Sequence, residues 1–537
     1  MQNRKPRRHT GKPLVRVPNF ESGLISEPLL AFGGQHMHVD PKTGLSLYGP
    51  YTLVGQSSPT PRSAVVGIIG PPSMIADAEA WLQPCQGMLT NDGSQPFLYP
   101  HFPGFHKDAP FQCDLVFGET WRETIKDSAF KTAIAEPEFY GRVKNVVQLY
   151  SEALETIAAR EPQPQVVLCC IPQDVVDSCT VQKGRRARPK KIVAPGASLS
   201  DRRQMTFFDV MDGTPGAEDE EWGHQNLRRG LKAEAMQFGL PTQLVWPRTL
   251  RVAGTPASGP QRVQDLSTRA WNFCTALYHK VGGAPWRLAE LEAGVCFVGI
   301  SFYKELFEEN PRIRSSMAQA FTATGDGYVL RGKAFEWDER QQGRSPHLDK
   351  NLAASLLRDV IELYQKQNRG SLPSRIVVHK TSRFWEEEIE GLEEACRIIP
   401  RKDFVALGSR RLQFYRTGDY PPLRGTYVKF SESDLLLYTS GYIPYLRTYP
   451  GARVPQPMEI LEHIGDSPWD TVLREIMSLT KMNWNTADFS GSDPITTAFS
   501  RRVGEVLAEV PPGRKIRPEY RFYMQLHSRS LMAIDWR

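Results

Sequence analysis

Hydrophobic residues recur at helical spacing between residues 227 and 238, which predicts an amphipathic helix there. Gly239 and Pro241 end this helix, because glycine favours a helix C-terminus and proline cannot continue one. A short apolar strand is predicted at residues 243–246. A second helix is predicted from about Ser267, and the Gly282-Gly283 pair ends it.

Three polar residues are predicted to lie at the ends of these elements: Lys232, Gln243 and Lys280. Two ammonium groups and an amide that converge from separate elements suit a phosphate monoester, because lysines supply charge and the amide supplies a directed hydrogen bond. The alternative is that both lysines are ordinary solvated side chains on helix surfaces.

Two α/β units are predicted along the chain. A helix at 136–160 and a buried strand at 165–171 indicate the start of a parallel, doubly wound sheet. A second unit begins at Ala293. Its predicted elements, in order, are a strand at 293–303, a hairpin from Phe321 turning at Gly325-Asp326-Gly327, a helix at 350–367, a strand at 375–379 and a helix at 385–396.

Composition excludes some classes of protein. The chain has 537 residues, enough for about two or three domains. Its net charge of +6 is modest, but residues 4–16 and 183–191 are strongly basic. The eight cysteines show no metal-binding spacing, which favours a reducing, cytoplasmic location. No apolar run is long enough to cross a bilayer, so we expect no membrane association.

The order Lys232, Pro-Thr-Gln at 241–243 and Lys-Val-Gly-Gly at 280–283 resembles the 5′-phosphate pocket of Argonaute MID domains. The resemblance extends from Glu27 to Met524 and includes Leu-Thr-Lys-Met-Asn-Trp-Asn at 479–485. It identifies the chain as similar to short prokaryotic Argonautes with MID-PIWI organisation.

The resemblance implies an α/β fold class, with a Rossmann-like MID domain followed by an RNase H-like PIWI domain and an N-terminal segment packed on them. The expected divisions are a basic flexible leader (1–26), an N-terminal segment (27–160), the MID domain (161–290, with a loop insertion at about 182–221), the PIWI domain (291–524) and a C-terminal extension (525–537).

The resemblance also implies a nuclease site whose carboxylates are missing here. RNase H-like nucleases hold two divalent metals with acidic residues, and the matching positions are Ser301, Thr381 and Arg501. Asp326 and Glu336 are the alternative ligands, although ordinary turn and strand-end charges are the simpler interpretation. We therefore expect no catalytic residues and no enzyme activity in this chain.

The remaining expected site residues also follow from the resemblance. Arg228 lies where the family commonly has an aromatic residue or histidine, and is expected to help bind the guide 5′-phosphate with Lys232, Gln243 and Lys280. A structural Mg²⁺ is expected at the phosphate, near Gln243. Lys481, Asn483 and Asn485 are expected to contact the guide or target backbone.

By resemblance, the chain anchors a small guide, RNA rather than DNA, and recognises complementary single-stranded DNA in antiviral defence by abortive infection. The expected partner is an APAZ-domain effector protein (TIR, sirtuin-like NADase or nuclease). The resemblance leaves open whether the complex assembles into a higher oligomer on activation. Two alternatives remain: an active guided nuclease with relocated metal ligands, and a doubly wound small-molecule enzyme.

Overall fold

The computed structural model describes residues 20–51, 60–91, 95–180, 226–251, 265–304, 306, 313–321 (backbone only), 327–338, 342–343, 345–410, 412–418, 421–431, 434–451, 454–511 and 513–524. The expected loop insertion at 182–221, the C-terminal extension at 525–537 and all but residues 20–26 of the leader lie outside this description.

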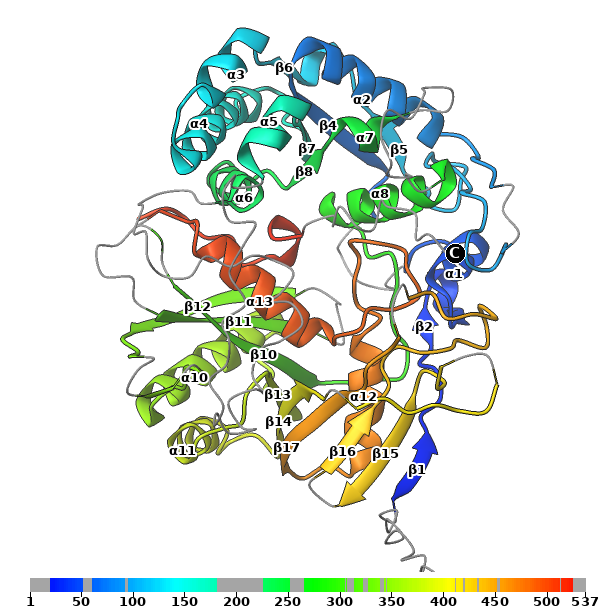
Figure 1. The fold of residues 1–537 in the computed structure, drawn as a ribbon, viewed down its shortest axis with the longest axis vertical. Coiled ribbons are helices and arrows are strands. Elements are labelled where there is room, and N and C mark those ends of the chain that lie inside the picture. The colour runs from blue at the N-terminus through cyan, green and yellow to red at the C-terminus, as the bar shows by residue number, and fades with distance from the viewer. Residues whose placement is uncertain are drawn as a thin grey trace, which may run out of the picture.

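The upper unit in Figure 1 is built on a five-stranded parallel sheet with strand order β5-β4-β7-β8, in which β6 also pairs with β4. The strands are β4 (Ser63–Gly70), β5 (Asp114–Val116), β6 (Arg122–Thr124), β7 (Val166–Cys170) and β8 (Thr242–Val245). All five residues of β7 are buried, as expected for a parallel strand covered on both faces.

Helices cover both faces of this sheet. They are α2 (Pro72–Cys85), α3 (Asp127–Ile134), α4 (Phe139–Ala158), α5 (Gln173–Cys179), α6 (Leu227–Gln237), α7 (Pro247–Leu250) and α8 (Leu266–Lys280). One hydrophobic core joins the sheet to α3, α4, α5 and α6, and another joins it to α2 and α8. The predicted helices at 136–160, 227–238 and from 267 are confirmed as α4, α6 and α8.

The sheet crosses the boundary that we expected at residue 161. Strand β4 pairs in parallel with β7, so Val66 lies opposite Val166, although the two strands are a hundred residues apart in the chain. Residues 63–124 therefore belong to the same sheet as the expected MID domain and do not form a separate layer. Parallel pairing between strands so far apart leaves no local signal in a sequence.

The lower unit is a nine-stranded sheet with order β1-β15-β16-β17-β14-β13-β10-β11-β12. Its strands are β1 (Glu21–Leu24), β10 (Val295–Lys304), β11 (Ile313–Phe321), β12 (Gly327–Phe335), β13 (Arg375–Lys380), β14 (Arg401–Ser409), β15 (Thr426–Ser431), β16 (Asp434–Leu437) and β17 (Met458–Gly465). Only β10, β13 and β14 pair in parallel, at the centre.

Among the described elements, two helices pack on each face of the nine-stranded sheet. On one face lie α10 (Lys350–Gln367) and α11 (Glu386–Ala395). On the other lie α12 (Trp469–Leu479) and α13 (Ile495–Leu507). The expected order of strand, hairpin, helix, strand and helix is confirmed, although the hairpin turn at 322–326 lies outside the described residues.

The N-terminal segment joins the two units. Strand β1, which we had placed in a flexible leader, pairs with β15 at the edge of the nine-stranded sheet. Strands β2 (Leu30–Ala31) and β3 (Met37–His38) form a small sheet with β9 (Arg287–Leu288), next to α1 (Pro41–Tyr48). Three short 3-10 helices complete the described elements: Gly33–Gln35, Glu119–Trp121 and Tyr520–Phe522.

Candidate phosphate-binding site and its neighbours

Three elements of the five-stranded unit bring the predicted pocket residues together. Helix α6 begins at its cap Asn226 and carries Lys232 near its middle, which corrects the expected position at a helix end. Gly239 has φ +68 and turns the chain into β8, which carries Gln243. Lys280 is the last residue of α8, as predicted.

The three side chains meet inside the protein. The Lys280 ammonium donates to the Gln243 side-chain oxygen, and the Lys232 ammonium donates to the backbone oxygen of Thr242 at 3.2 Å. The exposed fractions are 0% for Lys280, 2% for Lys232 and 3% for Gln243. The alternative of solvated surface lysines is therefore wrong.

Burial makes the charged form of both lysines costly. Burial lowers the pKa of Lys232 to about 8, and the guanidinium of Arg228 adds to this effect, while the Cys169 thiol opposes it. Burial, followed by repulsion from Lys232, lowers the pKa of Lys280 well below its usual range. No carboxylate in the described part of the chain contributes to either shift.

The pocket has spare hydrogen-bond donors. An ammonium group carries three N–H donors, and among the described residues each of these two lysines finds one acceptor. In the described part of the chain these two buried cations have no anion beside them and keep several unused donors. They are complementary to a group such as a phosphate, which supplies negative charge and several acceptor oxygens.

The described pocket residues do not fit the expected Mg²⁺. The Gln243 oxygen, the natural ligand atom, already accepts from Lys280, and two ammonium groups beside it repel a cation. Within the described residues, no three His, Cys, Asp or Glu side chains come together in a possible metal site. We therefore assign no metal to these residues.

Arg228 takes part in an aromatic stack beside the pocket. Trp246 follows β8, and two guanidinium groups lie over its indole ring. The guanidinium carbon Cζ is 4.3 Å from the ring centroid in Arg228 and 4.7 Å in Arg248. All three side chains are partly exposed. Arg228, where we expected no aromatic side chain, therefore lies against the aromatic ring of the residue that follows β8.

Two further residues near the pocket were missed in the sequence. The Cys169 thiol of β7 interacts with both lysines, and its burial raises its pKa to about 12. His279 packs its ring 4.4 Å from that of Trp484, and burial lowers its pKa to about 4. Trp246 and His279 could have been found from their positions next to pocket elements, whereas a cysteine in an apolar strand is typical of a core residue.

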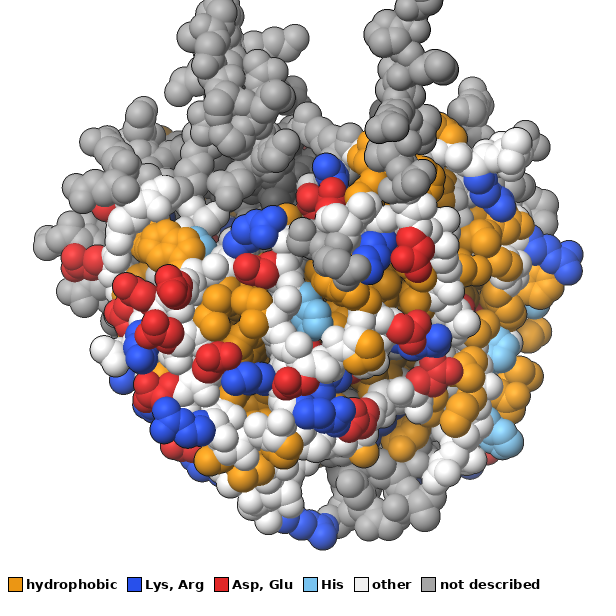
Figure 2. All heavy atoms as spheres, turned by 90° about the horizontal axis from the view of Figure 1, so that it is seen from below, with side chains coloured by type: hydrophobic (Ala, Val, Ile, Leu, Met, Phe, Trp, Pro, Cys, Tyr) orange, Lys and Arg blue, Asp and Glu red, His pale blue; other side chains and the backbone are white. Residues whose placement is uncertain are grey.

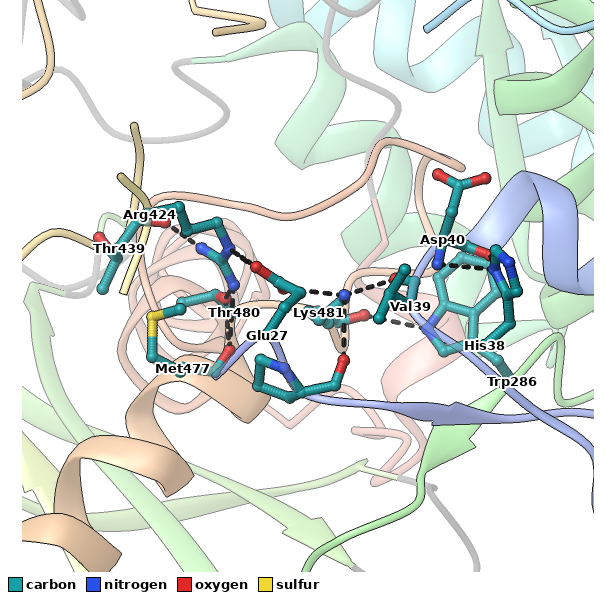
Figure 3. A network of polar contacts seen from close by, with 11 residues as sticks. Glu27, His38, Val39, Asp40, Trp286, Arg424, Thr439, Met477, Thr480 and Lys481 are labelled. Atoms are coloured by element: carbon teal, nitrogen blue, oxygen red, sulfur yellow. Dashed lines mark hydrogen bonds and ion pairs between the residues drawn. The ribbon is translucent and has the colours of Figure 1, made fainter. Parts of the chain in front are cut away.

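Lys481 does not have the predicted role. Its ammonium donates to Glu27 at 2.9 Å, to the backbone oxygen of Pro28 at 3.2 Å and to that of Val39 at 2.5 Å. These three acceptors use all three N–H donors of the ammonium, so none is left for a nucleic-acid backbone. Figure 3 shows Glu27 between Lys481 and Arg424, so this network attaches the N-terminal segment to the nine-stranded unit.

The two asparagines lie in the same loop. The Asn483 side-chain oxygen accepts from the backbone N–H of Asn485 at 3.2 Å, and the side chain is partly exposed. Asn485 is buried, and its amide nitrogen and oxygen have no partner in the described structure. Contact with a guide or target backbone stays a prediction for both residues.

The three expected catalytic positions lie at neighbouring elements. Ser301 of β10 donates its hydroxyl to the backbone oxygen of Ser500 in α13 at 2.6 Å. Thr381 is exposed directly after β13, the parallel neighbour of β10. Arg501 of α13 lies 3.8 Å from Asp493. Of the alternative ligands, Glu336 is exposed and Asp326 lies outside the described residues.

Comparisons with known proteins show which fold this chain resembles. No protein-family model matches the sequence. Protein argonaute of Aquifex aeolicus (strain VF5) is 23% identical over 301 residues, which cover 52% of this chain and 36% of that protein.

Solved structures extend the similarity to nearly the whole fold. Clostridium butyricum Argonaute, bound to a guide DNA and a 19-mer target DNA, matches 92% of this chain with a TM-score of 0.57 and 15% identity. Drosophila Piwi matches 94% with a TM-score of 0.54 and 12% identity. This chain covers 54% and 56% of those two chains, so it spans about half their length. The chain is therefore Argonaute-like, with an α/β fold that matches the MID and PIWI parts of Argonaute structures.

Proposed function

We propose that this protein binds a small guide nucleic acid by its 5′-phosphate, in the pocket formed by Lys232, Gln243 and Lys280. The observation that carries the proposal is the pair of buried ammonium groups that have no carboxylate beside them among the described residues. Folding places these charges side by side at a cost, and a bound phosphate offsets that cost.

The guide is RNA and the target is complementary single-stranded DNA in this proposal. Base pairing supplies the specificity, so the protein needs an anchor for the guide and contacts to its backbone, and no side chains that read bases. The Clostridium butyricum structure, which holds a guide and a target, supports a paired guide on this fold. The RNA and single-stranded DNA preferences rest on the resemblance of the chain, from Glu27 to Met524, to short prokaryotic Argonautes.

We also propose that the chain does not cleave its target and instead activates an APAZ-domain effector as part of an immune system. The support is the chemistry of Ser301, Thr381 and Arg501, since a hydroxyl or guanidinium at these positions does not hold a divalent metal as a carboxylate does. Guide-loaded protein mixed with complementary DNA and Mg²⁺ or Mn²⁺ is expected to leave the DNA intact. Metal-dependent cleavage would instead favour a nuclease with relocated ligands.

The pocket is tested by the double variant Lys232→Met with Lys280→Met, which shortens each side chain by one heavy atom and removes both charges. We expect this variant to lose most of the small nucleic acid that co-purifies with the protein. The matched control is Lys131→Met with Lys144→Met, which makes the same charge change at exposed positions of α3 and α4. Equal amounts of bound nucleic acid in the two variants would contradict the assignment, and sequencing that material tests the RNA preference.

A further inference from the structure

Three buried aromatic rings meet beside the phosphate pocket, where the two units touch. His279 precedes Lys280 in α8, Trp484 lies in the loop after α12, and Tyr520 begins the 3-10 helix Tyr520–Phe522. The ring centroid of His279 is 4.4 Å from that of Trp484 and 5.9 Å from that of Tyr520. The exposed fractions of the three residues are 5%, 1% and 4%. Segments far apart in the chain therefore bring these rings to one place.

Each ring carries a buried polar atom that has no hydrogen-bond partner in the described structure. These atoms are Nε2 of His279, Nε1 of Trp484 and the hydroxyl oxygen of Tyr520. A buried polar atom without a partner destabilises the folded state, so such atoms are rare in proteins. Three of them on neighbouring rings point to a polar group that the described chain does not itself supply.

The hydrogen-bond chemistry of the three rings specifies that group. His279 Nδ1 lies 3.0 Å from the backbone oxygen of Gly283, which can only accept, so Nδ1 carries the hydrogen. Burial lowers the pKa of His279 to about 4, so the ring is uncharged at neutral pH and Nε2 can only accept. Trp484 Nε1 can only donate, and the Tyr520 hydroxyl can do both. A phosphate oxygen has no hydrogen to donate to Nε2, whereas a hydroxyl group can satisfy all three atoms.

We propose that His279, Trp484 and Tyr520 bind a ribose 2′-hydroxyl near the 5′ end of the guide and thereby select RNA over DNA. This inference rests on the proposed function, which anchors the guide 5′-phosphate at Lys280. Lys280 directly follows His279, so their Cα atoms are about 3.8 Å apart and an anchored strand begins beside the three rings. The 2′-hydroxyl both donates and accepts, and it is the group that RNA has and DNA lacks.

The test compares 5′-phosphorylated RNA oligonucleotides that differ by one oxygen atom. Each carries a single 2′-deoxy sugar at the first, second or third nucleotide, and fluorescence anisotropy measures its affinity for the full chain freed of nucleic acid. We expect one of the three to bind about tenfold more weakly than all-ribose RNA, because the missing hydroxyl leaves buried polar atoms unpaired in the complex. A change below about twofold at all three positions, where no such hydrogen bond is lost, would overturn the inference.

The variant Tyr520→Phe removes one hydroxyl from the protein and keeps the ring. We expect it to reduce the tenfold difference to about threefold, because one of the hydrogen bonds to the ribose is then missing in both complexes. Tyr523→Phe is the matched control, since the Tyr523 hydroxyl already donates to the backbone oxygen of Arg517 at 2.7 Å. Equal discrimination in the two variants would overturn the inference while leaving the proposed function in place. Equal affinity of the unmodified protein for 5′-phosphorylated and 5′-hydroxyl RNA would overturn both.

Discussion

At the scale of single residues, the buried charges that suit the pocket to an anion lower the stability of the protein when no anion is bound. A charged lysine that is buried without an anion disfavours the folded state, because its ammonium group loses hydration that nothing replaces. Lys232 and Lys280 are both in this situation among the described residues, whereas Lys481, equally buried, has Glu27 beside it. This difference separates a lysine available to a ligand from one used to hold the fold together.

Lys232→Met is therefore expected to stabilise the empty protein. A folded-state pKa of about 8, against an ordinary value of 10.5, corresponds to a cost of about 3 kcal/mol at neutral pH. Because the folded pKa of Lys232 is lowered, this residue makes the free energy of unfolding of the unmodified protein rise with pH between about 8 and 10.5. The variant is expected to lack this contribution and therefore to show a smaller rise. Urea denaturation of nucleic-acid-free protein at several pH values measures both effects. A less stable variant with an unchanged pH dependence would contradict the expectation.

The stack around Trp246 makes a second prediction at this scale. Trp246→Leu removes the ring that holds the Arg228 and Arg248 guanidinium groups, and each contact of this kind contributes about 0.5–1 kcal/mol. We expect a guide affinity about fivefold weaker, corresponding to about 1 kcal/mol, as measured by fluorescence anisotropy with a 5′-phosphorylated oligonucleotide. Trp385→Leu is the control. Trp385 is an exposed residue at the N-terminus of α11, and its ring stacks on that of His347. Equal affinities in the two variants would argue against a role for the stack.

At the scale of elements, one loop connects three parts of the molecule. Residues 480–487 follow α12, and Lys481 of this loop bonds to the N-terminal segment. The backbone oxygen of Lys481 accepts from Trp286 at 3.0 Å. The backbone N–H of Ala487 donates to Asn272 of α8 at 2.9 Å. The loop therefore contacts the helix that ends in Lys280.

Glu27→Gln tests the attachment of the N-terminal segment. Burial raises the pKa of Glu27, but Arg424 and Lys481 outweigh this and lower it below its ordinary value of 4.5. The neutral variant leaves two buried cations without their carboxylate, which is expected to cost about 3 kcal/mol. Chemical denaturation measures this loss against Glu119→Gln, whose carboxylate is exposed and for which we expect a change within about 0.5 kcal/mol.

The sign of the pH effect follows from the same network. Because the folded pKa of Glu27 is lowered, its contribution to stability is present above 4.5 and is lost as pH falls through the folded value. The Glu27→Gln variant is expected to lack this part of the acid sensitivity. An unchanged acid profile would mean that the carboxylate does not stabilise the attachment.

At the scale of the whole molecule, the pocket lies where the two sheets approach each other. Helices α6 and α8 form the lower side of the upper unit in Figure 1, and Arg229 of α6 pairs with Glu505 of α13 at 2.9 Å. On the face of the molecule drawn in Figure 2, acidic and basic side chains are mixed, with hydrophobic ones exposed between them. The coloured, described part of that face shows no cluster of positive charge of the kind that binds a nucleic-acid backbone, in contrast to the pocket.

Guide binding is expected to protect both units. Lys280 is adjacent to His279, whose ring packs on Trp484 of the loop at 480–487, so an ordered pocket orders the loop as well. Hydrogen exchange measured by mass spectrometry should slow in α8 and in residues 481–487 when a 5′-phosphorylated oligonucleotide is added. The hydroxyl oligonucleotide is the control. Protection confined to α6, β8 and α8 would show that the effect stops at the pocket.

The amino-acid sequence by itself determined several of the helices and strands and the kinds of charge available. Helical periodicity located α4, α6, α8 and α10, because each helix must bury one face. It also identified Lys232, Gln243 and Lys280 as a candidate group. It could not show that β4 pairs with β7, nor that β1 joins the sheet that contains β15.

Only the tertiary structure decided which cation meets which partner. Lys280 is the last residue of α8, and Lys481 lies two residues beyond the end of α12. Lys280 nevertheless faces a second lysine, whereas Lys481 faces Glu27, which is 454 residues away in the chain. A lysine's pKa and its role depend on charges within a few ångströms. Packing between distant segments sets those distances, and local hydrophobic patterns carry no information about them.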